Sequence, residues 1–124
     1  MSIPINIGEL LEKECVNTEL YLQHDLTLAQ LAAAIGTNRT YLSTWFSQQG
    51  ITYNTYINRL RIEHFCRLYH DATADAVATA QPTYVSAQSM AIASGFHSYS
   101  TFSAAFKKIM GQTVTAWMKG EGNT

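Results

Sequence analysis

Two groups of short polar side chains recur in this sequence, each a few residues after a glycine, Gly36 or Gly95. Most members are serine or threonine, and a few carry positive charge. The groups are Asn38, Arg39, Thr40, Ser43, Thr44 and Ser47 in the first half, and His97, Ser98, Tyr99, Ser100, Thr101, Ser103, Lys107 and Lys108 in the second. Hydroxyl and cationic side chains of this kind suit hydrogen bonding to base edges and to phosphate oxygens.

Helical periodicity predicts the elements that position these side chains. Thr27 and Gln30 form a capping-box pattern at the start of a short helix, which Gly36 ends. Asn38 is placed to cap the next helix, which ends at Gly50. Because alternation of apolar and polar residues is almost absent, the sequence predicts an all-α fold.

Two longer helices are predicted around these short ones. Residues 7–23 have apolar side chains at roughly helical spacing and are expected to form one amphipathic helix. Thr52 caps a long helix over residues 53–71, about 28 Å long at a rise of about 1.5 Å per residue. The Ala- and Thr-rich residues 72–84 follow, and we expect them to be a partly helical, mobile connection, because Pro82 forbids further helix.

The second half of the chain repeats the first. The second copy has one more residue in the turn after its first glycine and one more between Phe106 and Gly111 than the first copy has at the matching places. Both differences are changes of loop length. Each copy is typical of a helix-turn-helix unit, whose second helix places its exposed face in the major groove of DNA. The matched positions are Ala32 with Ala91, Gly36 with Gly95, Leu42 with Phe102, Phe46 with Phe106, and residues 50–57 with residues 111–118.

Residues 20–119 resemble the AraC/XylS-type DNA-binding domain of bacterial transcription regulators. The resemblance implies a fold of about seven helices that forms two helix-turn-helix subdomains joined by a long linker helix. These insert two recognition helices into successive major-groove segments of double-stranded DNA. The resemblance also implies no enzymatic activity, no cofactor and no small-molecule ligand, and the other partners would be further domains of a longer parent protein and RNA polymerase. The segments that carry it are residues 26–43, 56–62, 95–103, 106–108 and 111–113.

The sequence departs from the family pattern in three places. Family members often carry arginine two positions after the leucine or phenylalanine of each recognition helix, where this chain has Thr44 and Ala104. One residue is missing between Phe46 and Gly50, and the connection over residues 72–84 is longer than usual. These departures keep a second function open, that of a helical protein-interaction domain that retains the fold without strong DNA binding.

Three cations distinguish the two functions, because an interaction domain would not need Arg39, Lys107 and Lys108 where they stand. Arg39 opens the first recognition helix and can grip guanine in a bidentate way. The two lysines come late in the second helix, where phosphate is the expected contact.

Charge is divided unevenly along the chain. Residues 1–25 carry five acidic side chains and one lysine, whereas residues 26–120 carry seven basic and three acidic ones, although the whole chain has a net charge of only −1. A mildly basic body behind an acidic N-terminal segment is compatible with phosphate binding.

Composition excludes several classes of protein. With 47% hydrophobic and 14% charged residues, the chain can bury a core and is not a disordered segment. It has no apolar run of about 20 residues and no signal-peptide pattern, and its two cysteines form neither a disulfide framework nor a zinc site. We therefore expect a cytoplasmic location and no membrane contact by this part of the protein.

Catalytic and metal-binding patterns are also missing from the sequence. It contains no acid pair, nucleophile elbow or phosphate loop, so an enzyme is not predicted. His64 and His70 are six residues apart and do not share a helical face, so a metal site is not predicted either.

The predicted organisation is therefore an acidic N-terminal helix within residues 1–25 that packs on the first subdomain, a first helix-turn-helix unit in 26–52, the linker helix in 53–71, the connection in 72–84, a second unit in 85–119 and a tail in 120–124.

Overall fold

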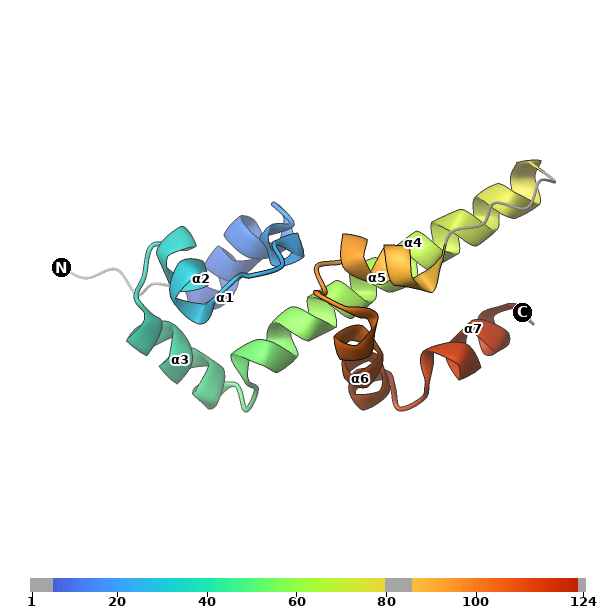
Figure 1. Ribbon diagram of the computed structural model, residues 1–124. Coiled ribbons are helices and arrows are strands. Elements are labelled where there is room, and N and C mark those ends of the chain that lie inside the picture. Colours follow the sequence, from blue (N-terminus) through green and yellow to red (C-terminus); the bar gives the residue numbers. More distant parts are fainter. Residues whose placement is uncertain (1–5, 80–85, 123–124) are drawn as a thin grey trace. The chain divides into compact units, whose positions relative to one another are not determined.

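The computed structural model describes residues 6–79 and 86–122, and the regular structure within these ranges is entirely helical. This confirms the predicted all-α class. The α-helices are α1 (Ile7–Leu11), α2 (Leu28–Ala34), α3 (Arg39–Gln48), α4 (Tyr53–Thr79), α5 (Ala87–Ala93), α6 (Tyr99–Met110) and α7 (Val114–Gly122) (Figure 1).

The chain forms two compact units, residues 1–60 and residues 61–124, and each has its own hydrophobic core. The long helix α4 supplies Ile57 to the first core and Ile62 and Phe65 to the second. The other buried members of the first core are Leu11, Cys15, Tyr21, Leu26, Leu31, Ala32, Ile35, Leu42 and Phe46, and those of the second are Met90, Ala91, Phe96, Phe102, Phe106, Val114 and Trp117.

Aromatic rings anchor α3 in the first unit. Phe46 is only 2% exposed, and its ring centroid lies 5.2 Å from that of Tyr56 and 6.2 Å from that of Tyr53, both on the first turns of α4. Burial, with Cys15 and Glu12 nearby, raises the pKa of the Tyr56 phenol far above its usual value, so this side chain stays neutral. α3 is therefore held against the start of α4 by uncharged rings.

The second unit repeats this arrangement around Phe106. The Phe106 ring lies 5.6 Å from Trp117 of α7 and 6.0 Å from Phe65 of α4, and the Phe65 ring lies 4.5 Å from Phe102. Four aromatic side chains from three helices thus share one core. As the repeat alignment predicts, Phe106 takes the place in this unit that Phe46 takes in the first.

The N-terminal segment differs from the single helix predicted over residues 7–23. α1 passes into a π-helical turn at Glu12–Val16, the chain reverses at Glu19 with φ of 58°, and a short 3-10 helix follows at Leu20–Leu22. A continued helix would place Thr18 and Glu19 on the buried side below Cys15. The reversal instead brings Tyr21 into the core, where it is 2% exposed.

The linker helix is longer than predicted. α4 runs to Thr79 and not to residue 71, because the alanines of the following segment have high helix propensity. Residues 80–84, which include Pro82 and the rest of the predicted connection, lie outside the described residues. At the other end α7 continues to Gly122, so the predicted tail from residue 120 is helical as far as the structure describes it.

The aromatic anchors generate a test of the repeat. Phe46→Ala and Phe106→Ala should each lower the free energy of unfolding by about 3–5 kcal/mol, because each removes a buried ring and leaves a cavity. Chemical denaturation followed by circular dichroism measures the loss. Gln48→Ala, on the exposed side of α3, is the control and should stay within about 0.5 kcal/mol of the parent. A phenylalanine variant as stable as the parent would show that the two positions are not equivalent anchors.

Candidate nucleic-acid interface

The two helix-turn-helix units use the same hydrogen bonds at their turns. In the first, Thr37 N donates to Ala32 O at 2.9 Å and Gly36 N to Ala33 O at 3.1 Å. In the second, Phe96 N donates to Ala91 O at 3.2 Å and Gly95 N to Ile92 O at 3.1 Å. Gly36 and Gly95 have φ of 82° and 103°, a conformation that side chains with a Cβ rarely adopt. The first helix of each unit, α2 or α5, therefore ends in the same way, at a glycine with a left-handed backbone conformation.

Each recognition helix begins with a capping side chain that was predicted to contact DNA. Asn38 Oδ1 accepts a hydrogen bond from Tyr41 N at 2.9 Å, and Ser98 Oγ accepts one from Thr101 N at 3.1 Å. Ser98 also donates to the Thr101 hydroxyl at 3.0 Å. Asn38 and Ser98 therefore determine where α3 and α6 begin, and Thr101 shares its hydroxyl with the cap.

The polar face of α3 is fully open to solvent. Leu42 and Phe46 define its buried side, and Thr44 lies almost opposite to them on the helix. The predicted residues Arg39, Thr40, Ser43, Thr44 and Ser47 are all exposed. The structure thus gathers the first predicted group on one helix surface.

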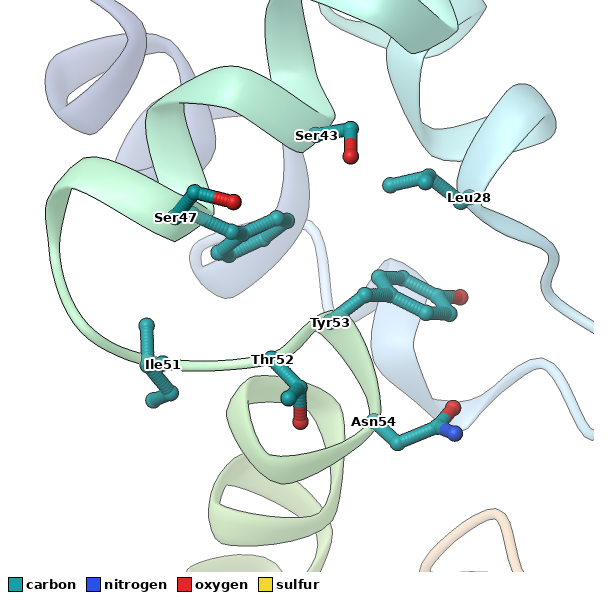
Figure 2. A pocket seen from close by; sticks show the side chains of 8 residues that line it. Leu28, Ser43, Ser47, Ile51, Thr52, Tyr53 and Asn54 are labelled. Carbon is teal, nitrogen blue, oxygen red and sulfur yellow. The ribbon is translucent and has the colours of Figure 1, made fainter.

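Two of these residues lie at the edge of a hollow. Ser43 and Ser47 are one helical turn apart and border a cavity of about 310 Å³ between α3, the start of α2 and the start of α4 (Figure 2). Leu28 and Tyr53 lie on its other sides, and the Tyr53 hydroxyl donates to the carbonyl of Leu26. On this side of α3 the hydroxyl groups of Ser43 and Ser47 therefore lie beside a cavity that apolar side chains such as Leu28 partly line.

The second predicted group is less uniformly exposed. His97, Ser100, Thr101, Lys107 and Lys108 are exposed, whereas Ser98, Tyr99 and Ser103 are partly buried. The Tyr99 ring packs 5.5 Å from that of Phe102, so part of its surface belongs to the core. Ala104, which stands where the family often has arginine, is exposed and offers only a methyl group.

The sequence did not identify Tyr41 as a site residue. Its side chain is 66% exposed on α3, between the predicted residues Thr40 and Ser43. The sequence contains a signal for this exposure. The repeat matches Leu42 with Phe102, so its apolar position is Leu42 and not the neighbouring Tyr41.

Two side chains of α4 hold the turn of the second unit. Arg61 is buried, with its guanidinium 5.8 Å from the centre of the Phe96 ring. The Ser94 hydroxyl donates to Met90 O at 2.7 Å, so its oxygen accepts from Nδ1–H of His64 at 3.0 Å. These contacts reach both sides of Gly95 and support the start of α6.

The sign of the exposed charge differs between the N-terminal segment and the helices α3 and α6. Arg39 is the first residue of α3, and Lys107 and Lys108 lie in the last turn of α6. The acidic side chains Glu9, Glu12 and Glu19 are exposed on the segment before α2. A polyanion would therefore be attracted to the recognition helices and repelled from the N-terminal segment.

Neither a membrane helix nor a metal centre is present in the part of the chain that the structure describes. No helix there combines the length and the apolar character that crossing a bilayer requires. Within the same residues, no three histidine, cysteine or acidic side chains come together in a group that could hold a metal ion.

Comparison with known proteins gives one match. A family model described as a helix-turn-helix domain, of the AraC type, matches residues 31–120. This is a family of DNA-binding transcription regulators and not of enzymes. No curated protein and no solved structure matches the chain significantly.

The caps lead to a prediction about stability. Asn38→Ala and Ser98→Ala should each lower the free energy of unfolding by about 1 kcal/mol, because the first backbone N–H groups of α3 or α6 lose their acceptor. Thermal unfolding measures the change. Asn38→Ser and Ser98→Asp keep a capping oxygen and should remain near the parent. Equal stability of the alanine variants and the parent would rule out a capping role.

Proposed function

Since the chain belongs to the AraC-type helix-turn-helix family, we propose that it is the DNA-reading output domain of a bacterial transcription regulator. In this proposal α3 and α6 enter successive major-groove segments of one duplex. The observation that carries it is the duplicated unit, in which the same turn and the same cap present a polar helix face twice. Other domains of a longer parent protein and RNA polymerase would be its further partners.

The two recognition helices would contribute differently. α3 presents Arg39 at its N-terminal end, the end that comes closest to base edges in this motif, with Thr40 and Thr44 on its exposed side. α6 has Ala104 in the middle of its exposed face and its two lysines in the last turn. We therefore propose that α3 supplies most of the discrimination between bases and that α6 mainly binds phosphate.

The alternative function is a protein-interaction domain that keeps the fold. The observation in its favour is that the exposed positions Thr44 and Ala104 lack the arginine that the family often has there. The cations at Arg39, Lys107 and Lys108 argue against it, because all three are exposed on the two helices that would enter the grooves. Binding of the chain to duplex DNA with a strong dependence on salt decides between the two functions.

Arg39 and the two lysines should respond differently to substitution. Arg39→Ala should weaken binding by about 1–3 kcal/mol on the preferred duplex and much less on a scrambled one. Lys107→Ala combined with Lys108→Ala should weaken binding to both duplexes alike and reduce the slope of log K against log salt by up to about two. Fluorescence anisotropy at several salt concentrations measures both effects.

Lys13→Ala provides a charge-matched control, because Lys13 is exposed on the acidic N-terminal segment. It should leave both duplexes bound nearly as tightly as by the parent. Equal losses on the two duplexes for Arg39→Ala would remove Arg39 as a base reader. Absence of binding to any duplex by the parent would favour the interaction domain.

The arrangement on DNA can be tested without knowledge of the regulated gene. On a duplex selected from a random pool, hydroxyl-radical footprinting should show two protected segments about 10 base pairs apart on one face of the helix. Insertion of about 5 base pairs between them should remove protection of one segment, because it would rotate that segment to the opposite face. A single protected segment, unaffected by the insertion, would contradict the use of both units.

A further inference from the structure

Tyr41 has a property that no other exposed residue of α3 shares. Its side chain is 66% exposed, and among the described residues the only other large hydrophobic side chain that is exposed is Met110, at 37%. Within residues 6–79 and 86–122 the Tyr41 phenol makes no hydrogen bond and its ring makes no aromatic contact. The ring is therefore available to a partner.

The position of Tyr41 determines which partner can reach it. Leu42 and Phe46 mark the buried side of α3, and Tyr41 precedes Thr44 by three residues, so both lie on the outward side. A side chain on a helix leans towards the helix N-terminus, so the Tyr41 ring lies over the turn near Thr37 and Asn38, where α3 begins. That end of a recognition helix comes closest to base edges.

The chemistry of the surrounding residues indicates what the ring would contact. The exposed neighbours Thr40 and Thr44 are short and hydroxylated, so they suit polar atoms of the bases and the backbone. In the major groove, the 5-methyl group of thymine is the apolar group that distinguishes base pairs. An exposed ring on this surface is suited to that group.

We propose that Tyr41 packs its ring against the methyl group of a thymine and so determines a preference for thymine at one position of the bound site. The inference rests on the proposed DNA-binding function and adds a base reader to it. The contact is with the ring and not with the hydroxyl, so Tyr41→Phe should bind within about twofold of the parent.

The test is a thermodynamic cycle between protein and DNA. The full chain selects a preferred duplex from a random pool, and each thymine of that duplex is then replaced in turn by deoxyuridine, which lacks only the methyl group. For the parent, one replacement should weaken binding about fourfold, the effect of losing one buried methyl-sized group. Tyr41→Ala should bind the thymine duplex about tenfold more weakly than the parent and should not distinguish it from the deoxyuridine duplex.

Met110→Ala removes the other exposed apolar side chain and serves as the matched control, with the same thymine-to-deoxyuridine ratio as the parent. Thermal unfolding of each variant shows that it is folded before its affinity is compared. If Tyr41→Ala proves unstable, Tyr41→Leu replaces it and should likewise lose at least part of the discrimination.

Several results would overturn the inference and leave the proposed function standing. Equal discrimination by Tyr41→Ala and the parent would show that the ring does not contact the methyl group. A loss in Tyr41→Phe as large as in Tyr41→Ala would assign the contact to the hydroxyl, as expected for a phosphate. Unchanged affinity of Tyr41→Ala would indicate that the ring serves a protein partner. If the parent binds no duplex, the proposed function fails, and the inference fails with it.

Discussion

The burial of one phenylalanine on each recognition helix determines which side chains that helix can offer to a partner. Phe46 and Phe106 each lie four residues after another buried side chain, Leu42 or Phe102, and the two together define one stripe on the helix. Aromatic rings surround each phenylalanine closely, so α3 and α6 cannot rotate without losing those contacts. The outward face is consequently determined by the core.

The turn before each recognition helix imposes a second constraint. Ala32 and Ala91 are completely buried, and each accepts the hydrogen bond that closes the turn. A larger side chain at either position would separate the two helices, and a residue with a Cβ at Gly36 or Gly95 would strain the left-handed backbone. The second turn is one residue longer, but it keeps both hydrogen bonds of the first, so the insertion is absorbed after the glycine and before Ser98.

Much of this could be predicted from the sequence because the relevant signals are local. Capping by Thr27, Asn38 and Thr52 depends on residues three positions away, and the structure confirms all three caps. The reversal at Glu19 could not be predicted in this way, because a single helix over residues 7–23 satisfies the local pattern almost as well. Only packing against the rest of the first core favours the turn that buries Tyr21.

In the candidate site, too, local sequence patterns predict some features and miss those that depend on packing. Exposure of Thr40, Thr44 and Ser47 follows from helical periodicity, so the sequence places them on one face. The burial of Arg61 does not follow from periodicity. It depends on the Phe96 ring, which lies far along the sequence and reaches α4 only in the folded second unit. A long charged side chain can bury its stem and its guanidinium face when an aromatic ring lies beneath it.

The two units therefore have similar scaffolds but different means of support. In the first, the Tyr53 hydroxyl of α4 binds the carbonyl of Leu26 just before α2. In the second, His64 of α4 donates to Ser94 at the end of α5. Either contact ties the helix-turn-helix to the helix on which it packs, and each can be made by α4 without any residue of the recognition helix. The exposed faces of α3 and α6 can therefore differ in sequence while the contacts that support each unit are kept. This explains how one repeated fold can present an arginine at the start of α3 and two lysines at the end of α6.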